Sequence, residues 1–279
     1  MTRLALNRAR YEARVGGAGR PLLLLHGFTG SAATWAPHLR AFRSSHRTIA
    51  VDLLGHGRSD APSDPRRHAV PAQAADLAAL LGRLDATPAD VLGYSMGARV
   101  ALQLALDHPA AVRRLVLESP SAGIADPAER ARRRASDDEL AARIERDGVP
   151  AFVERWEALP IFASHATLPP AARRRLRRQR LANDAAGIAA SLRGAGQGAM
   201  EPLHERLGEV RAPTLVVAGR LDEAGTERAT AVAGAIRGAR LEVVEGAGHT
   251  PHLEQPAAFR RIVVSFLAGG ASLPDTPTH

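Results

Sequence analysis

Short apolar runs alternate along most of the chain with longer stretches in which apolar residues recur every three or four positions. The short runs predict buried strands, and the longer stretches predict helices packed on a sheet. The expected strands span residues 21–26, 47–51, 89–94, 113–118, 213–218 and 240–245. The expected helices lie near residues 32–43, 71–84, 96–107, 226–236 and 256–267. This alternation is typical of an α/β fold with a doubly wound, mostly parallel sheet.

The pattern changes between residues 121 and about 205, which are rich in Arg and Ala and helical in character, without a convincing strand. We therefore expect one α/β core, residues 1–119 and 206–268, with a helical lid, residues 120–205, inserted after the fourth strand. The lid would cover the carboxyl ends of the strands. The first residues of the chain alternate and turn like an edge hairpin. Residues 269–279 are expected to form a flexible tail.

The most informative motif is Gly-Tyr-Ser-Met-Gly at residues 93–97, between a predicted strand and a predicted helix. It has the G-x-S-x-G form of a nucleophile elbow, a sharp turn that exposes a serine hydroxyl. Glycines two positions before and after Ser95 fit such a turn, because a Cβ there would crowd it. A serine becomes an effective nucleophile or base only when a neighbouring group takes its proton. The motif could also be an ordinary strand–turn–helix connection, so its partners decide the matter.

Candidate partners follow two later strands. Asp222 comes after the strand at 213–218, and His249 ends the glycine-rich loop after the strand at 240–245. The order Ser, acid, His is that of the α/β-hydrolase fold, and open α/β sheets build their sites at the carboxyl ends of strands. His249 would take the proton of Ser95, and Asp222 would orient the imidazole.

Other residues could fill these roles. Glu223 or Asp52 could be the acid, and Asp222 could simply cap a helix. His252 is the nearest rival of His249, although the Ala-Gly-His sequence that ends at His249 favours the latter.

The first predicted strand opens into a His-Gly-Phe turn. The backbone N–H groups of Phe28 in this turn and of Met96 after the elbow serine would form an oxyanion hole. We expect His26, in the same turn, to be structural rather than an acid or a base. The loop Asp52–Ser59 is expected to be structural as well, because its glycines allow backbone angles that other residues avoid.

Composition narrows the class of protein further. The 279 residues carry a formal net charge of +8, every basic residue other than histidine is Arg, and there is no Cys. The absence of Lys indicates a compositional bias, and with only 4% aromatic residues the charge does not favour nucleic-acid binding. No apolar stretch is long enough to span a membrane, and no metal cluster or phosphate-binding loop is evident. We expect a cytoplasmic protein without cofactor, metal or membrane partner.

Arg99 is unusual because it lies one turn after Ser95 in a helix that should be mostly buried. It is either a salt-bridged structural residue or a cation that binds an anionic substrate near the nucleophile.

Several segments together resemble a known family. They are residues 93–99, 117–123, 129–133, 136–141, 152–164, 180–183 and 191–198. Over about residues 20 to 267 the chain resembles the 2-succinyl-6-hydroxy-2,4-cyclohexadiene-1-carboxylate synthase (MenH) family of the α/β-hydrolase superfamily. Two departures are visible: Asp222 is followed by Glu-Ala-Gly where the family usually has a Lys-Phe segment, and Ala98 replaces the second glycine of a Gly-Gly pair.

The resemblance implies a lyase that removes pyruvate from 2-succinyl-5-enolpyruvyl-6-hydroxy-3-cyclohexene-1-carboxylate in menaquinone biosynthesis. It implies that Ser95, activated by His249 and Asp222, is the base that takes the proton alpha to the succinyl ketone. The substrate has three carboxylates. By the family's pattern the residues that bind it or line its pocket are Tyr94, Arg99, Arg133, Trp156 and Arg180.

Neighbouring arginines leave the register of Arg133 and Arg180 open by about one position. Two further functions also stay open at this point. One is a serine hydrolase acting on a small ester, amide or C–C substrate, and the other is a non-catalytic receptor on the same fold. A monomer and a homodimer are both compatible with the sequence.

Overall fold

The computed structural model describes residues 2–269 and contains one eight-stranded sheet with the order β1-β2-β4-β3-β5-β6-β7-β8. The strands are β1 (Thr2–Leu6), β2 (Ala9–Gly16), β3 (Arg20–Leu25), β4 (His46–Val51), β5 (Ala89–Tyr94), β6 (Val112–Glu118), β7 (Thr214–Gly219) and β8 (Arg240–Val244). β1 and β2 form the expected antiparallel hairpin at one edge, and every pair from β4 to β8 is parallel.

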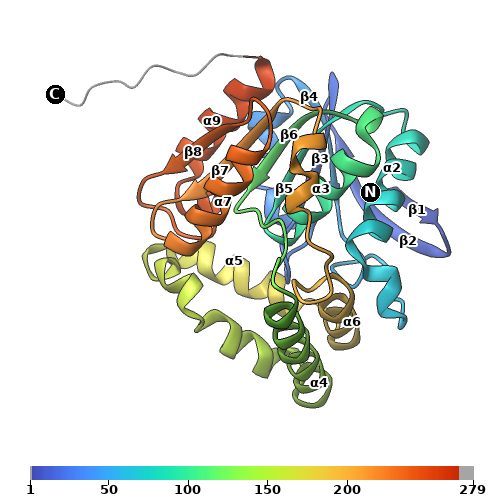
Figure 1. Ribbon diagram of the computed structural model, residues 1–279, viewed down its shortest axis with the longest axis vertical. Coiled ribbons are helices and arrows are strands. Elements are labelled where there is room, and N and C mark those ends of the chain that lie inside the picture. The colour runs from blue at the N-terminus through green and yellow to red at the C-terminus, as the bar shows by residue number, and fades with distance from the viewer. Residues whose placement is uncertain (1, 270–279) are drawn as a thin grey trace.

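Helices cover the sheet and one end of it (Figure 1). The α-helices are α1 (Leu39–Phe42), α2 (Val70–Arg83), α3 (Met96–Asp107), α4 (Pro127–Glu157), α5 (Pro170–Leu181), α6 (Ala185–Ala195), α7 (Glu223–Ala235), α8 (Pro251–Glu254) and α9 (Pro256–Ala268). The 3-10 segments are η1 (Ala32–Trp35), η2 (Pro65–His68), η3 (Pro109–Ala111), η4 (Pro160–Thr167) and η5 (His204–Glu209).

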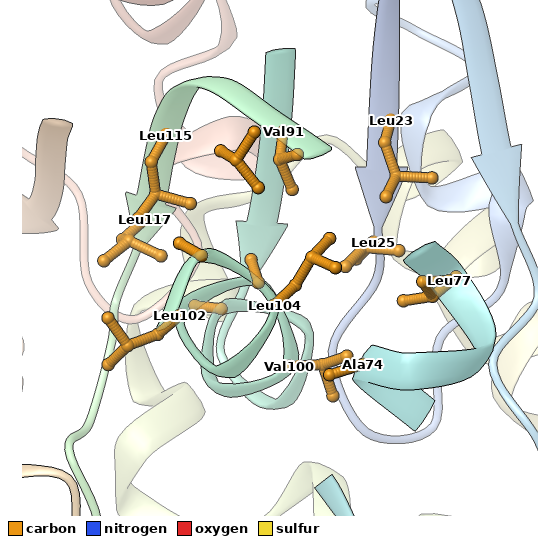
Figure 2. Packing of buried hydrophobic residues seen from close by; sticks show 14 of the residues in the cluster. Leu23, Leu25, Ala74, Leu77, Val91, Val100, Leu102, Leu104, Leu115 and Leu117 are labelled. Atoms are coloured by element: carbon orange, nitrogen blue, oxygen red, sulfur yellow. The ribbon is translucent and has the colours of Figure 1, made fainter. Parts of the chain in front are cut away.

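Helix α3 lies in the main hydrophobic core, where it packs on the sheet and beside helix α2. Eleven of its residues are buried, from Met96 to Leu106. Figure 2 shows Leu104 beside Leu25 of β3, and Val100 beside Ala74 of α2. Burying each such aliphatic side chain stabilises the fold by about 1.5–3 kcal/mol. The position of α3, and of the elbow that begins it, is therefore fixed by packing.

Successive parallel strands are added on opposite sides of the pair β3–β5. From β3 the chain passes outward to β4, and from β5 it passes the other way to β6, β7 and β8. Loops that leave neighbouring strands at such a switch point diverge and leave a crevice at the carboxyl ends. Ser95 follows β5 and Phe28 follows β3, so both lie at this crevice.

Helices α4, α5 and α6 gather beside one end of the sheet, in the lower part of Figure 1. No strand lies between Glu118 and Thr214, a stretch that the structure describes throughout. Helix α4 is bent where Gly148 takes a φ of 79° and Pro150 follows, since proline cannot donate to the helical ladder. α4 and α6 share an apolar cluster, against which Phe28 of the core packs.

Two expected helices differ in the structure. The helix expected at 32–43 is wrong: it is divided into η1 and the single turn α1, because Pro37 interrupts the hydrogen bonding between them. The helix expected at 226–236 begins three residues earlier, at Glu223, because the side chain of Asp222 accepts a hydrogen bond from the Gly225 N–H and caps it.

Among residues 2–269, no helix combines the length and apolar character that crossing a membrane requires. The expected tail, residues 269–279, lies outside the described residues except for Gly269, which ends α9 with a φ of 90°.

Candidate active site

Ser95 occupies a strained turn between β5 and α3. Its φ is 51° and its ψ is −107°, a conformation that residues other than glycine rarely adopt. The turn is possible because its flanking residues are glycines: a Cβ on Gly93 would lie 2.2 Å from the Gly97 carbonyl oxygen. The backbone N–H of Ser95 also donates to the Glu118 carbonyl at the end of β6. The local structure is that of the elbow that the sequence predicts.

His249 joins Ser95 and Asp222 into one hydrogen-bonded line. Its Nε2 lies 3.1 Å from the Ser95 Oγ, and its Nδ1 lies 2.7 Å from Oδ2 of Asp222. The three side chains come from residues up to 154 positions apart in the chain. This geometry allows the serine hydroxyl to donate to the imidazole while the carboxylate fixes the orientation and tautomer of the ring.

Asp222 has two structural tasks. Oδ1 accepts a hydrogen bond from the Gly225 N–H at 2.9 Å, while Oδ2 accepts from His249. Burial by itself would raise the pKa of Asp222, but the hydrogen bond and charge of His249 and the Gly225 N–H outweigh it and lower the pKa. Capping a helix and orienting the histidine are therefore compatible in this residue.

The loop that carries His249 is held in place by one buried carboxylate, that of Glu254, and by the hydroxyl of Ser119. Glu254 accepts hydrogen bonds from the Gly248 N–H, the Thr250 N–H and the Thr250 hydroxyl, at 2.5, 3.0 and 2.6 Å. The hydroxyl of Ser119 donates to the His249 carbonyl at 2.9 Å. These bonds limit the movement of His249 before any ligand binds.

The rival residues lie elsewhere. His252 is buried and hydrogen-bonds to Glu118 through Nδ1 at 2.8 Å. Asp52 accepts from the backbone N–H groups of Ala32 and Arg58 and so organises its own loop. Glu223 is exposed in the first turn of α7. In the described chain, none of the three hydrogen-bonds to His249 or Ser95.

His26 bonds to backbone groups on both sides of its ring. Nε2 accepts from the Leu53 N–H at 3.0 Å, and Nδ1 lies 2.8 Å from the Gly27 carbonyl oxygen. Burial lowers its pKa, so it is a neutral structural residue, as expected from the sequence.

The backbone near Phe28 and Met96 is close to the serine. A Cβ on Gly27 would lie 2.5 Å from the Tyr94 ring and 3.4 Å from the Ser95 Cβ, so the turn after β3 touches the elbow. Met96 is the first residue of α3, and the first N–H groups of a helix have no partner within it. Both residues line the cavity described next. The turn after β3 and the first turn of α3 therefore both border the cavity into which Ser95 opens.

Ser95 and His249 open into a cavity of about 760 Å³ between the sheet and the helices α4 and α6. Of the expected substrate residues, it is lined by Tyr94, Arg99, Arg133 and Trp156. The Trp156 ring packs against Phe28 and Phe162, with centroids 5.3 and 5.7 Å away. The cavity walls thus combine aromatic rings with guanidinium groups.

Arg99 is a buried cation without a carboxylate partner. It is 7% exposed and donates to the Ala195 carbonyl at 2.6 Å. No carboxylate of residues 2–269 forms an ion pair with it, so it is not the salt-bridged structural residue that the sequence allowed. Burial, and secondarily the charge of Arg133, lower its pKa to about 10. A buried charge is unfavourable until it is paired, so this group favours an anion in the cavity.

The other two expected arginines differ from Arg99. Arg133 lines the cavity and pairs with Asp137 one turn further along α4, at 2.8 Å. Arg180 does not line this cavity: it hydrogen-bonds to Glu157 at 3.2 Å and lies over the Phe162 ring, 5.1 Å from its centroid. It lines a hollow of about 40 Å³ on the other side of Phe162, together with Tyr94. Arg180 is therefore near the cavity but behind an aromatic ring.

The structure adds lining residues that the sequence analysis did not single out. They are Ile161 and Phe162 of η4 and Arg228 of α7. The ring of Phe162 lies 6.2 Å from the His249 ring. Arg228 comes six residues after Asp222, and no motif in the sequence singled it out. The Glu-Ala-Gly segment that departs from the family pattern forms the first turn of α7.

Comparisons with known proteins agree with the fold. The family model described as alpha/beta hydrolase fold matches residues 20–256. A Bacillus subtilis (strain 168) protein, provisionally named 2-succinyl-6-hydroxy-2,4-cyclohexadiene-1-carboxylate synthase, is 40% identical over 90% of this chain and 91% of its own. The structure of MenH from S. aureus superposes with a TM-score of 0.88 and 32% identity, covering 93% of this chain and 98% of that one. A Variovorax paradoxus (strain S110) protein, provisionally named carbamate hydrolase RutD, is 34% identical over 96% of this chain and 98% of its own.

The chain is therefore an enzyme of the α/β-hydrolase fold family. Within that family it belongs to the 2-succinyl-6-hydroxy-2,4-cyclohexadiene-1-carboxylate synthases, enzymes of menaquinone biosynthesis, as the resemblance in sequence indicated.

Proposed function

We propose that this enzyme is a carbon–oxygen lyase that converts 2-succinyl-5-enolpyruvyl-6-hydroxy-3-cyclohexene-1-carboxylate into 2-succinyl-6-hydroxy-2,4-cyclohexadiene-1-carboxylate and pyruvate. The observation that carries the proposal is Arg99, a buried guanidinium without a carboxylate partner in residues 2–269, in the same cavity as Ser95. Asp126, Glu129 and Asp137 also line the cavity, but none of them forms an ion pair with Arg99. A substrate with three carboxylates supplies an anion that can pair with this guanidinium. The names of the relatives support the choice of substrate.

The reaction begins with a proton transfer. Ser95 Oγ, whose own proton passes to His249 Nε2, removes the ring proton at C2, alpha to the succinyl ketone. The C2–H electron pair forms the C2=C3 bond, the former C3=C4 pair forms C4=C5, and the C5–O bond breaks. Pyruvate leaves as its enolate and takes a proton. Asp222 stabilises the imidazolium while the proton resides on His249.

The developing negative charge on the succinyl ketone oxygen requires donors. The backbone N–H groups of Phe28 and Met96 are the candidates, because both residues line the cavity beside Ser95. Arg99 and Arg133 would bind carboxylates, and Tyr94 and Trp156 would shape the pocket. Arg180 would join them only if Phe162 turned aside, since that ring now lies between Arg180 and the cavity. We propose residues 120–205 as a lid over this site.

A serine hydrolase is the second candidate, and the specific observation that favours it is the ready-formed Ser95–His249–Asp222 line. The relative named as a carbamate hydrolase shows that a similar sequence carries a hydrolase name. A hydrolase would form an acyl-enzyme on Ser95, whereas the lyase uses Ser95 only as a base. The intact line also argues against a receptor without catalysis.

A coupled assay separates the two functions. The purified protein is given the enolpyruvyl-cyclohexene substrate, and pyruvate release is followed with lactate dehydrogenase. We expect rapid release by the wild-type enzyme and a loss on the order of 10²–10⁴-fold in Ser95→Ala, with an unchanged circular dichroism spectrum. Absent release together with a burst of product from small esters would replace the lyase by the hydrolase. The cytoplasmic location and the oligomeric state stay predictions of the sequence.

A further inference from the structure

The catalytic cavity borders a second, more open hollow of about 550 Å³. The two hollows share two lining residues, Ile161 of η4 and Arg228 of α7. The outer hollow is otherwise lined by the segments around Pro160–Ser164 and Leu221–Ala224. Ile161 and Arg228 therefore stand where the cavity meets the exterior.

The segments on both sides of this opening, η4 and α7, contact the catalytic residues or their neighbours in the chain. On one side, His165 of η4 lies 2.7 Å from the Thr250 hydroxyl, next to His249. On the other side, Asp222 caps α7 through the Gly225 N–H. The opening thus leads directly to the catalytic line, and its width depends on two segments that already contact the residues around His249.

Arg228 is the cation of this opening. It is exposed, and no ion pair joins it to any carboxylate of residues 2–269. The exposed carboxylates nearest in sequence, Glu223 and Glu227, leave it unpaired, and its charge contributes to lowering the pKa of Asp222. Two carboxylates also line the outer hollow: Asp222, which is hydrogen-bonded to His249, and Glu223, which is exposed. The guanidinium of Arg228 is the group there that attracts anions and matches the geometry of a carboxylate.

We propose that the opening between Ile161 and Arg228 is the entrance to the active site, and that Arg228 captures a carboxylate of the incoming substrate there. Arg228 is then a specificity residue at the mouth, distinct in place from the buried Arg99 of α3 and from the exposed Arg133 of α4. The chemical class of the ligand, a carboxylate, follows from Arg228 itself. Only the identity of the full substrate rests on the proposed function.

The first test measures steady-state kinetics of Arg228→Gln at several ionic strengths. We expect kcat/KM to fall by roughly threefold to tenfold at low salt, with a flatter salt dependence than the wild-type enzyme, and kcat to change less. The matched control is Arg237→Gln, an exposed arginine just after α7 that lines neither hollow. An unchanged kcat/KM in Arg228→Gln, or an equal fall in Arg237→Gln, would overturn the proposal.

A second test does not depend on the natural substrate. Ser95 is labelled with two fluorophosphonates that differ only in a terminal carboxylate, and the two rate constants are compared. In the wild-type enzyme the carboxylate should accelerate labelling at low salt. Arg228→Gln should abolish this preference, which is measured as the ratio of the two rate constants so that a change in Ser95 reactivity common to both probes cancels. Equal preferences in the two proteins would refute the role of Arg228.

Ile161→Trp tests the route itself. An indole ring is larger than the isoleucine side chain, so at the opening between the two hollows it should slow labelling by both probes. Unchanged labelling would place the entrance elsewhere. If the wild-type enzyme releases no pyruvate but shows the carboxylate preference, the proposed lyase is wrong and the entrance stands. If pyruvate is released but Arg228→Gln keeps wild-type kcat/KM and labelling, the entrance is wrong and the lyase stands.

Discussion

Arg99 donates a hydrogen bond to the backbone carbonyl of Ala195 across 2.6 Å and so joins helix α3 of the core to helix α6. The two residues are 96 positions apart in the chain. The bond satisfies one donor of the guanidinium but leaves its charge without a counter-ion in residues 2–269. A group of this kind stabilises a bound anion more than it stabilises the empty protein.

Replacing Arg99 should therefore separate activity from stability. In Arg99→Met we expect kcat/KM to fall by the strength of a charge-assisted hydrogen bond, about 1.5–3 kcal/mol. We expect Tm to stay within a few degrees, because the lost hydrogen bond is offset by removal of a buried unpaired charge. Arg193→Met is the control, since Arg193 pairs with Glu145 and does not line the cavity. Wild-type kinetics with a large loss of Tm would show that Arg99 is structural.

Glu254 should make the stability of the His249 loop depend on pH. Burial would raise its pKa, but the hydrogen bonds from Thr250, Gly248 and Ser164 outweigh it and lower the pKa. A carboxyl whose folded pKa is depressed contributes stability at pH above its unfolded value, and the contribution is lost as pH falls through the folded pKa.

In Glu254→Gln we expect the free energy of unfolding to fall by about 1–3 kcal/mol at pH 7, and kcat to fall as well. The amide NH₂ of Gln is a donor, so it would face N–H and hydroxyl donors from which the carboxylate accepted hydrogen bonds. Urea unfolding from pH 7 to pH 3 measures the difference from the wild-type protein, which should shrink toward the acid end. His165, 3.7 Å from Glu254 and with a pKa lowered by burial to about 4, faces the same carboxylate. The double variant with His165→Ala controls for its titration. A difference that is constant over this range would contradict the prediction.

Gly93, near the end of strand β5, and Gly82, in helix α2, should respond oppositely to replacement by alanine. At Gly93 the added Cβ would meet the Gly97 carbonyl at 2.2 Å, so Gly93→Ala should destabilise the protein by at least about 1–3 kcal/mol. At Gly82, within α2, nothing lies within 4 Å of the added Cβ, and Gly82→Ala should stabilise by about 0.4–1 kcal/mol. Chemical denaturation measures both. Equal effects would mean that the elbow is less tightly packed than the structure shows.

Much of the fold follows from local patterns in the sequence. Six apolar runs predicted the parallel strands, because a strand that is buried on both faces consists almost entirely of apolar residues. The Gly-x-Ser-x-Gly sequence predicted the turn at Ser95 because few other sequences tolerate it. The broken helix after β3 was missed because the helical pattern outweighed the single Pro37.

What the sequence by itself determined is the class of fold, the elbow at Ser95 and the identity of its candidate partners, since each depends on residue type and spacing along the chain. Only the tertiary structure decided that Asp222 rather than Asp52 meets His249, that Arg99 lacks a counter-ion within the described residues, and that Arg180 lies behind Phe162. Only it placed Arg228 beside Ile161. The physical reason is that pairing and burial of charges depend on which distant segments meet, and a linear pattern of residues does not contain those distances.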